Sequence, residues 1–211
     1  MINAAARKIP DDLLKQYGKT GYQGMNFRDG ASYKKAAPTV RAGVDPARDK
    51  RVSSIREALE KCGIRDGMVL SFHHHFRDGD YIVNMVMEEV ERMGIKDITI
   101  CASSLGAAHD PVARMIESGV VIGIQSSGVR GKIGEAISYG KLKTPAIIRS
   151  HGGRVRAIEE GDVHIDIAFI GAPTSDECGN ARGVGGKSDC GVLSYSMVDA
   201  QYADRVVVIT D

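Results

Sequence analysis

Apolar residues recur along the chain with two alternating periods. Short apolar runs that end in small or polar residues are typical of buried strands, and segments with apolar positions every three or four residues are typical of helices. The pattern predicts strands at residues 68–72, 97–102, 120–125, 145–149, 165–171 and 206–209. It predicts helices at residues 51–62, 80–93, 111–118, 131–139, 154–159 and 194–204.

The alternation of strands and helices indicates the fold class. Consecutive strands joined by helices need crossover connections, which are right-handed and give a mostly parallel sheet with helices on both faces. We therefore expect an α/β domain over residues 51–211. Residues 1–50 lack a sustained period and contain three prolines, so we expect an N-terminal arm that packs on a neighbouring subunit or on another part of the protein.

Charge and cysteine content exclude several classes of protein. The 28 Lys and Arg residues nearly balance the 27 Asp and Glu residues, so we expect no nucleic-acid partner. We expect no membrane partner, because no apolar stretch approaches the roughly 20 residues that a membrane helix needs. The four cysteines have no metal-site or disulfide spacing, which favours reduced thiols and a cytoplasmic location.

The first predicted strand ends in three histidines, His73, His74 and His75, which are followed by Arg77. Ligands of open α/β sheets bind at the carboxyl ends of the strands, so this run lies where a ligand is expected. Neighbouring strand residues point to opposite faces and cannot all ligate one ion, so we expect no metal site. The alternative is that the histidines are only a polar strand end.

Small, polar or basic residues also follow the other predicted strands. Parallel strand ends share one edge of the sheet, where serine hydroxyls, backbone N–H groups, histidines and arginines would converge. Such an edge suits an anionic substrate, a carboxylate or a phosphate. For any single serine or glycine, ordinary turn chemistry is the alternative. The glycine-rich segment 176–191 is expected to be a flexible loop that covers an acyl donor or contacts a partner.

Five long motifs carry a resemblance to a known family. They are VLSFHHHFRDGDYIVNMVMEE, CASSLGAAHDP, GIQSSGVRGKIGEAIS, IIRSHGGRVRAIEEGDVHIDIAFIGAP and DECGNARG. Together they resemble the alpha chains of citrate lyase, the citrate CoA-transferase subunits, over nearly the whole sequence.

The resemblance implies a family I CoA-transferase-like fold, in which two similar α/β halves enclose the acyl site. It implies a reaction in which citrate replaces acetyl on an acyl carrier protein, giving citryl-carrier and acetate. The implied partners are citrate, the acetyl-carrier gamma chain, the citryl lyase beta chain and further copies of this chain in a homo-oligomer. No tightly bound cofactor is implied, since acyl-CoA or the carrier's CoA-derived prosthetic group is the substrate.

The same resemblance assigns roles by position. Where relatives have a glycine-rich oxyanion loop, this chain has SFHHHFR, so His73, His74 and His75 become the candidate catalytic donors. The candidate substrate-binding residues are Arg77, Arg149 and Arg154 for citrate carboxylates, Ser103, Ser104 and Gly106 for a remaining carboxylate, and Gly152 and Gly153 for the acyl-pantetheine arm.

One departure from the family concerns length. The sequence stops at Asp211 with only the first of two expected halves, so we expect residues 1–211 to fold alone but not to transfer acyl groups. Two alternatives stay open: a sugar-phosphate isomerase or deaminase of related fold, and a non-catalytic half-domain. Against the isomerase, the strand ends offer His and Ser rather than the Asp, Glu or Lys that serves as its base.

Overall fold

The computed structural model describes residues 2, 6–18, 48–73, 76 and 80–211. The chain divides into two compact units, Met1–Tyr33 and Lys34–Asp211. The described part of the first unit contains α1 (Asp11–Gln16), a short helix with no buried side chain, which the periodicity did not predict. The N-terminal arm over residues 1–50 stays a prediction.

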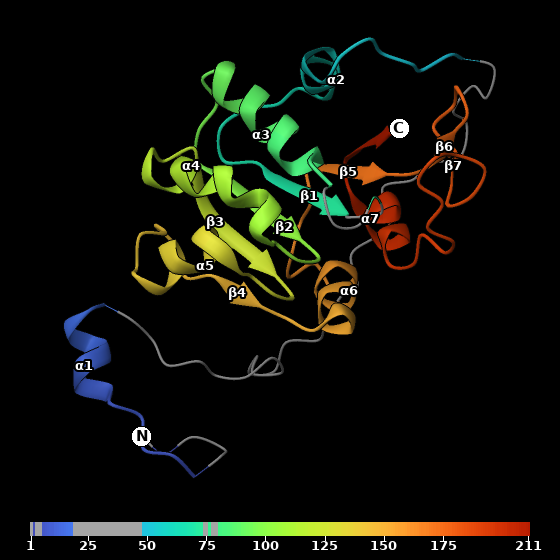
Figure 1. Ribbon diagram of the computed structural model, residues 1–211. Helices are drawn as coiled ribbons and strands as arrows, with labels where there is room; N and C mark the ends of the chain where they lie inside the picture. The colour runs from blue at the N-terminus through green and yellow to red at the C-terminus, as the bar shows by residue number, and fades with distance from the viewer. Residues whose placement is uncertain (1, 3–5, 19–47, 74–75, 77–79) are drawn as a thin grey trace. The chain divides into compact units, whose positions relative to one another are not determined.

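The second unit is built on a six-stranded parallel sheet (Figure 1). The strand order is β4-β3-β2-β1-β5-β8, and every pair is parallel. All six predicted strands are present with shifted ends: β1 (Val69–His73), β2 (Ile98–Ala102), β3 (Val121–Ser126), β4 (Ile147–Ile148), β5 (Ile167–Gly171) and β8 (Arg205–Ile209).

Helices cover both faces of this sheet, so the predicted fold class is confirmed. Side chains from one set of helices share a core with one face of the sheet: α2 (Ile55–Cys62), α3 (Ile82–Arg92), the 3-10 helix η1 (Ala107–Val112), α4 (Ala113–Glu117) and α5 (Gly131–Ser138). Two helices pack on the other face: α6 (His151–Glu159) and α7 (Ser196–Tyr202). In Figure 1, α6 and α7 lie close to the arrowheads of the strands.

The alternation of side chains along β1 explains why it is the central strand. Leu70 and Phe72 are buried in the larger core, where the Phe72 ring stacks on Phe169 with 5.3 Å between centroids. Val69 packs in the smaller core beneath α6 and α7. Since successive residues of a strand point to opposite faces, Ser71 and His73 share the α6/α7 face with Val69. This face of β1 is therefore partly polar.

The segment 176–191, expected to be a flexible loop, has local structure of its own. Its first residues form the turn and the second strand of an antiparallel hairpin, which joins β6 (Thr174–Ser175) to β7 (Ala181–Arg182). The Asp176 carboxylate accepts the backbone N–H groups of Cys178 and Asn180, which fixes the turn. Gly183 packs so tightly that a Cβ atom there would lie 1.7 Å from the Gly191 carbonyl oxygen. These contacts, which the sequence pattern does not reveal, order the segment.

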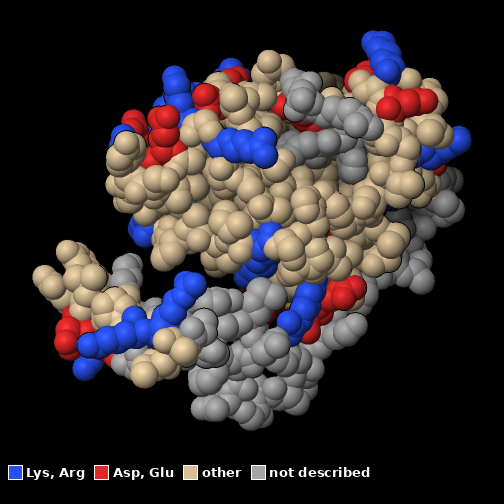
Figure 2. Space-filling model, turned by 60° about the horizontal axis from the view of Figure 1, so that its bottom comes forward, with Lys and Arg blue, Asp and Glu red and all other residues tan. Residues whose placement is uncertain are grey.

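The distribution of charged side chains and the state of the cysteines agree with the expectations from the composition. Figure 2 shows Lys and Arg interspersed with Asp and Glu, without a large patch of one sign among the described residues of that face. All four cysteines, each within the described part of the chain, are free thiols. No helix among the described residues is long and apolar enough to cross a membrane.

Candidate functional site

The site lies where the strand order of the sheet reverses direction. From β1 the chain adds β2, β3 and β4 on one side, and then returns to add β5 and β8 on the other. Ligands of open α/β sheets bind at the carboxyl ends of the strands at such a reversal. His73 is the last residue of β1 and is paired in register with Ile170 of β5, so it lies directly at this point.

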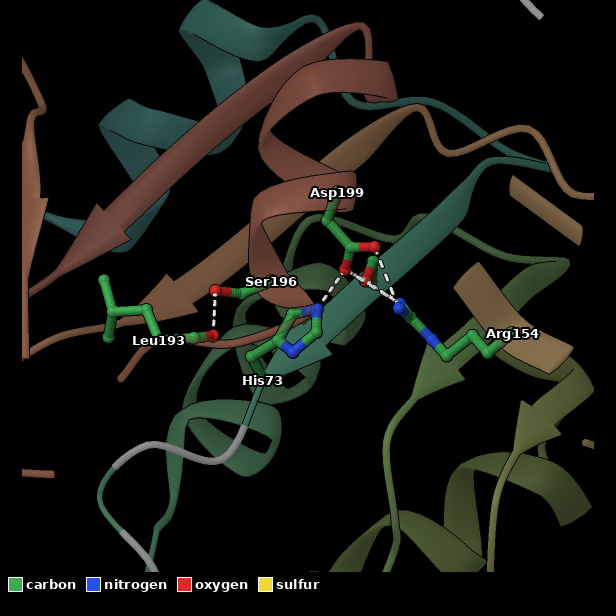
Figure 3. A network of polar contacts seen from close by, with 6 residues as sticks. His73, Arg154, Leu193, Ser196 and Asp199 are labelled. Atoms are coloured by element: carbon green, nitrogen blue, oxygen red, sulfur yellow. Dashed lines mark hydrogen bonds and ion pairs between the residues drawn. The ribbon is translucent and has the colours of Figure 1, made fainter. Parts of the chain in front are cut away.

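A buried polar network joins β1 to both helices of this face (Figure 3). At its centre is the Asp199 carboxylate from α7, which is fully buried. Its Oδ2 accepts hydrogen bonds from Ser71 Oγ at 2.5 Å, from Arg154 Nη2 at 2.8 Å and from His73 Nε2, and its Oδ1 accepts from Arg154 Nη1 at 2.9 Å. Arg154 Nη2 also donates to Ser71 Oγ at 2.7 Å. The carboxylate of α7 is thus held by three side chains from two other elements, β1 and α6.

Asp199 and Arg154 form an oppositely charged pair within this network. Burial by itself raises the pKa of the Asp199 carboxyl, but hydrogen bonds and charge from His73 and Arg154 outweigh it and hold the pKa at about 2. The Arg154 guanidinium is also buried, which lowers its pKa, but the neighbouring Cys101 and Asp199 raise it, and the net direction is upward. Asp199 is therefore an anion and Arg154 a cation throughout the physiological range.

An ionised carboxylate fixes which nitrogen of His73 faces it with a proton. A carboxylate can only accept hydrogen bonds, so the ring nitrogen that faces it must carry a proton. That nitrogen is Nε2 of His73, which lies against Asp199 Oδ2. Because the His73 side chain is only 2% exposed, it is directed into the protein rather than out of the strand end.

Three aromatic rings lead from this network to the surface. The Tyr195 ring, at the amino end of α7, lies 5.5 Å from the His73 ring and 4.9 Å from the His151 ring, tilted against both. His73 is buried, Tyr195 is half-buried and His151 is exposed. We call His73, Tyr195 and His151 the ring column. The column connects Asp199 to the start of α6.

The amino end of α6 follows β4 directly and carries several predicted substrate residues. Ser150 caps the helix by accepting the Gly153 N–H at 3.0 Å. Gly152 is exposed, and a Cβ atom there would meet nothing within 4 Å. Arg149 is half-buried, and its Nη1 donates to Gln125 Oε1 at 2.5 Å. First-turn N–H groups have no partner within a helix, so this end suits an anion.

The loop after β2 carries the two predicted serines and the predicted glycine Gly106. Ser103 is buried and Ser104 is exposed. The Gly106 N–H donates to Nδ1 of His109 at 3.1 Å, and the Nε2 of that histidine lies 3.1 Å from the Asp80 carbonyl oxygen. The Gly106 N–H therefore serves an internal contact in this structure, and its part in carboxylate binding stays a prediction.

The structure thus separates the predicted residues into groups. His73, Arg149, Gly152, Gly153 and Arg154 come together around β1 and α6. Ser103, Ser104 and Gly106 belong to the loop after β2. His74, His75 and Arg77 lie outside the described residues. Arg154 was expected to bind citrate, whereas its two terminal nitrogens contact Asp199 and Ser71 and its side chain is 3% exposed.

Sequence reasoning missed Ser71, Asp199 and Tyr195. The available signals were a hydroxyl in the middle of an apolar strand and an acidic residue on a predicted helix close to the sheet. Tyr195 and Asp199 are also four residues apart, a spacing that puts both on one helix face. None of these signals names a partner, because Asp199 is 128 residues from Ser71 and 45 from Arg154.

A group that could ligate a metal lies elsewhere in the described part of the chain. His164, Asp166 and Asp204 have ligand atoms within 4.8 Å of one another. They precede β5 and β8, at the amino ends of the strands and away from the ring column. His164 and Asp204 are exposed and form a hydrogen-bonded pair at 2.8 Å.

Comparison with known proteins places residues 48–211 in the family described as "Citrate lyase, alpha subunit (CitF)". The citrate lyase alpha chain of Haemophilus influenzae is 49% identical over 166 residues, which are 78% of this chain and 33% of that protein. The Klebsiella pneumoniae alpha chain is 43% identical over 203 residues, which are 94% of this chain and 38% of that protein. The chain therefore spans about a third of the length of these curated relatives.

Comparison with solved structures agrees with this family assignment. A Streptococcus mutans protein described as an alpha subunit of citrate lyase, crystallised in complex with citrate, is 52% identical with a TM-score of 0.84. The match covers 99% of this chain and 40% of that one. RipA from Yersinia pestis, 19% identical over 76% of this chain and 36% of its own with a TM-score of 0.55, shows a similar fold only.

Proposed function

The chain belongs to the citrate lyase alpha-subunit family, and we propose that it acts as a citrate CoA-transferase within citrate lyase. Citrate would replace the acetyl group on an acyl carrier protein, giving citryl-carrier and acetate. The observation that carries this proposal is the 52% identity, over 99% of the chain, to a protein crystallised with citrate. Nothing in these comparisons favours a sugar-phosphate isomerase or deaminase.

The exchange needs no covalent bond to the protein. A carboxylate oxygen of citrate attacks the carbonyl carbon of the acetyl thioester, and the C–S bond breaks. The carrier departs as a thiolate, and the product is a mixed anhydride of citrate and acetate. The thiolate then attacks the citryl carbonyl carbon of the anhydride, and acetate leaves. In both steps negative charge develops on a carbonyl oxygen, so each N–H donor aimed at that oxygen lowers the barrier by about 3 kcal/mol.

We place the carboxylates of citrate at the amino end of α6. Arg149 supplies a guanidinium beside the helix start, and the open space at Gly152 allows a ligand to approach the backbone. Gly153 belongs to the same first turn. The rest of the proposed site rests on the sequence alone. It keeps the predicted roles of His74, His75 and Arg77, and those of Ser103, Ser104 and Gly106.

Two residues receive a different role from the one that their sequence position indicates. His73 donates a hydrogen bond from Nε2 to Asp199, so the donors for the developing oxyanion are sought in His74, His75 and backbone N–H groups. Arg154 uses both terminal nitrogens inside the protein, so Arg149 and Arg77 are the proposed carboxylate ligands. His73 and Arg154 would then stabilise the site through their buried contacts with Asp199.

The partners follow from the same proposal. The acyl donor is the acetylated carrier of a gamma chain, whose CoA-derived thiol acts as substrate, and no tightly bound cofactor is proposed. The citryl lyase beta chain receives the citryl-carrier, and the subunit assembles as a homo-oligomer. We propose that the subunit acts in the cytoplasm, where thiols stay reduced, and its four free cysteines support this.

A test uses Gly152→Ala with a matched control. Alanine favours a helix over glycine by about 1 kcal/mol, and no atom obstructs a methyl group at this position, so the variant should fold at least as well as the wild type. In the citrate lyase complex, the methyl group should displace the ligand and lower kcat/KM for citrate by about tenfold to a hundredfold. The measurement is acetate release from acetyl-carrier and citrate.

Gly134→Ala is the control, since Gly134 also lies within a helix and a Cβ there makes only an ordinary contact at 3.5 Å. It should gain similar stability without loss of exchange. Equal kcat/KM for both variants would remove the α6 start from the citrate site. Absence of any citrate-dependent acetate release by the wild-type complex would refute the proposed function itself.

A further inference from the structure

The buried pair of Asp199 and Arg154 is not explained by stability alone. Removing two charges from water costs several kcal/mol for each ion, and apolar replacements of similar volume are often as stable. Here the acid is fully buried and the base is 3% exposed, at the point of the sheet where a ligand is expected. A cluster that is costly to bury and lies beside a candidate site calls for a role in that site.

The contacts of Asp199 point to His73. Arg154 neutralises the carboxylate through two parallel hydrogen bonds, and Ser71 occupies a further position on Oδ2. The remaining contact to Oδ2 comes from His73 Nε2. A carboxylate held by a bidentate guanidinium and a hydroxyl cannot rotate away, so the imidazole that binds it has a fixed tautomer and a fixed ring plane.

The fixed ring of His73 in turn supports the ring column. Tyr195 lies between the rings of His73 and His151, with centroid distances of 5.5 Å and 4.9 Å. His151 is the first residue of α6, beside the exposed Gly152. A change in the plane of the innermost ring would be passed through Tyr195 to the residue at the mouth of the proposed citrate site.

We propose that Asp199 is a positioning residue, which holds His73 with its proton on Nε2 and thereby fixes Tyr195 and His151 at the start of α6. The inference rests on the proposed function for its effect on exchange, and on the structure alone for the state of His73. Asp199 is fully buried, so we assign it no contact with substrate or the reacting atoms. It acts through the histidine.

The direct test is the protonation state of His73 in Asp199→Asn. Arg154 donates to both oxygens of Asp199, so either orientation of the amide sets its NH2 group against one guanidinium nitrogen, and neither keeps the anion that holds the proton on Nε2. Without that anion we expect the proton to leave Nε2 for Nδ1. We expect the correlation spectrum of 15N-labelled histidine in the intact chain to show Nε2 protonated in the wild type and Nδ1 protonated in the variant.

The kinetic test separates positioning from a structural role. Loss of the partner that orients a histidine lowers activity by about 10- to 100-fold at metal sites, and we expect a fall of similar size in kcat for exchange by Asp199→Asn. In a His73→Asn background the same change should lower kcat by less than about twofold, because the group it acts through is gone. A merely structural loss would multiply with that of His73→Asn.

Asp204→Asn is the matched control. Asp204 also accepts from a histidine nitrogen, that of His164 at 2.8 Å, but the pair is exposed at the opposite ends of the strands. It should change neither kcat nor the His73 spectrum. If Asp199→Asn does not fold, the apolar pair Asp199→Leu with Arg154→Met, which removes both charges together, should still release His73 from the Nε2 tautomer.

The outcomes distinguish this inference from the proposed function. An unchanged His73 tautomer in the folded variants, or losses of kcat that multiply with His73→Asn, would overturn the positioning role. A wild-type complex without citrate exchange would refute the proposed function, and the spectra would then decide the role of Asp199 by themselves.

Discussion

Replacing Arg154 by methionine tests the charge balance of the buried network most directly. Methionine keeps much of the length and apolar volume of the arginine stem, so the main loss is electrostatic. The change removes two hydrogen bonds to Asp199, of 2.9 Å and 2.8 Å, and one to Ser71, of 2.7 Å. It leaves a carboxylate that is 0% exposed without its cation. Breaking a buried pair in this way costs about 3–5 kcal/mol.

The expected loss is large for a protein of this size. Domains of comparable length have free energies of unfolding of about 5–15 kcal/mol, so Arg154→Met should remove a substantial fraction of the total. At about 2–4 °C per kcal/mol, the midpoint of thermal unfolding should fall by roughly 6–20 °C. Urea unfolding followed by circular dichroism gives the free energy, and a calorimetric scan gives the midpoint.

The control is Arg114→Met, at an arginine that also pairs with a carboxylate. Arg114 Nη1 lies 2.6 Å from Glu91, but its side chain is 54% exposed. Surface pairs contribute about 0–1 kcal/mol, so this variant should be nearly as stable as the wild type. Adding Asp199→Leu to Arg154→Met should recover part of the lost stability, since the unpaired charge is then gone.

The dependence on pH gives a second signature. The Asp199 pKa is about 2 in the folded protein, against 3.8 for an ordinary aspartate side chain. A carboxyl whose pKa is lowered by folding stabilises the protein above the unfolded pKa, here by about 2 kcal/mol, and that stability is lost as the pH falls from about 4 to about 2. Without Arg154 the Asp199 pKa should rise, so acid unfolding should begin at higher pH.

Two results would refute this reasoning. One is a cost of Arg154→Met no larger than that of Arg114→Met. The other is a double variant in which Asp199→Leu adds its full cost to that of Arg154→Met instead of offsetting it.

Three further changes have defined outcomes. Gly183→Ala should lower the free energy of unfolding by at least about 1–3 kcal/mol, measured by urea unfolding, because its Cβ would lie 1.7 Å from the Gly191 carbonyl oxygen. Burial lowers the pKa of His109, whose Nδ1 accepts the Gly106 N–H, so the unfolded chain takes up the proton first and stability should fall as the pH drops below about 6.5. In the full complex, Arg77→Ala should weaken citrate binding, measured by calorimetry, without a change in thermal midpoint.

Each of these three predictions has a control or an outcome that would contradict it. Gly128→Ala, where a Cβ meets nothing within 4 Å, should leave stability nearly unchanged, and an equal loss in both glycine variants would contradict the steric argument. His109→Gln should remove that histidine's share of the slope of stability below about pH 6.5, and an unaltered slope would assign it to other groups. Citrate affinity that does not depend on Arg77 would exclude it from the site.

The sequence by itself determined the class of the fold and the order of its elements. Apolar runs and helical periods record which residues are buried by their own strand or helix, and these are local properties. For that reason the six strands and most helices were predicted to within a few residues. Short elements without a period, α1 and the hairpin of β6 and β7, were missed.

Only the tertiary structure decided which of these residues meet. His73 and Arg154 look like surface donors in the sequence, because nothing near them in the chain shows a buried anion. That anion, Asp199, is 126 residues from His73 and 45 from Arg154, and the parallel sheet brings the three together by packing α6 and α7 on one face of β1. Strand period places His73 on a face, but what covers that face depends on crossover connections between distant segments, and no local pattern encodes such a contact.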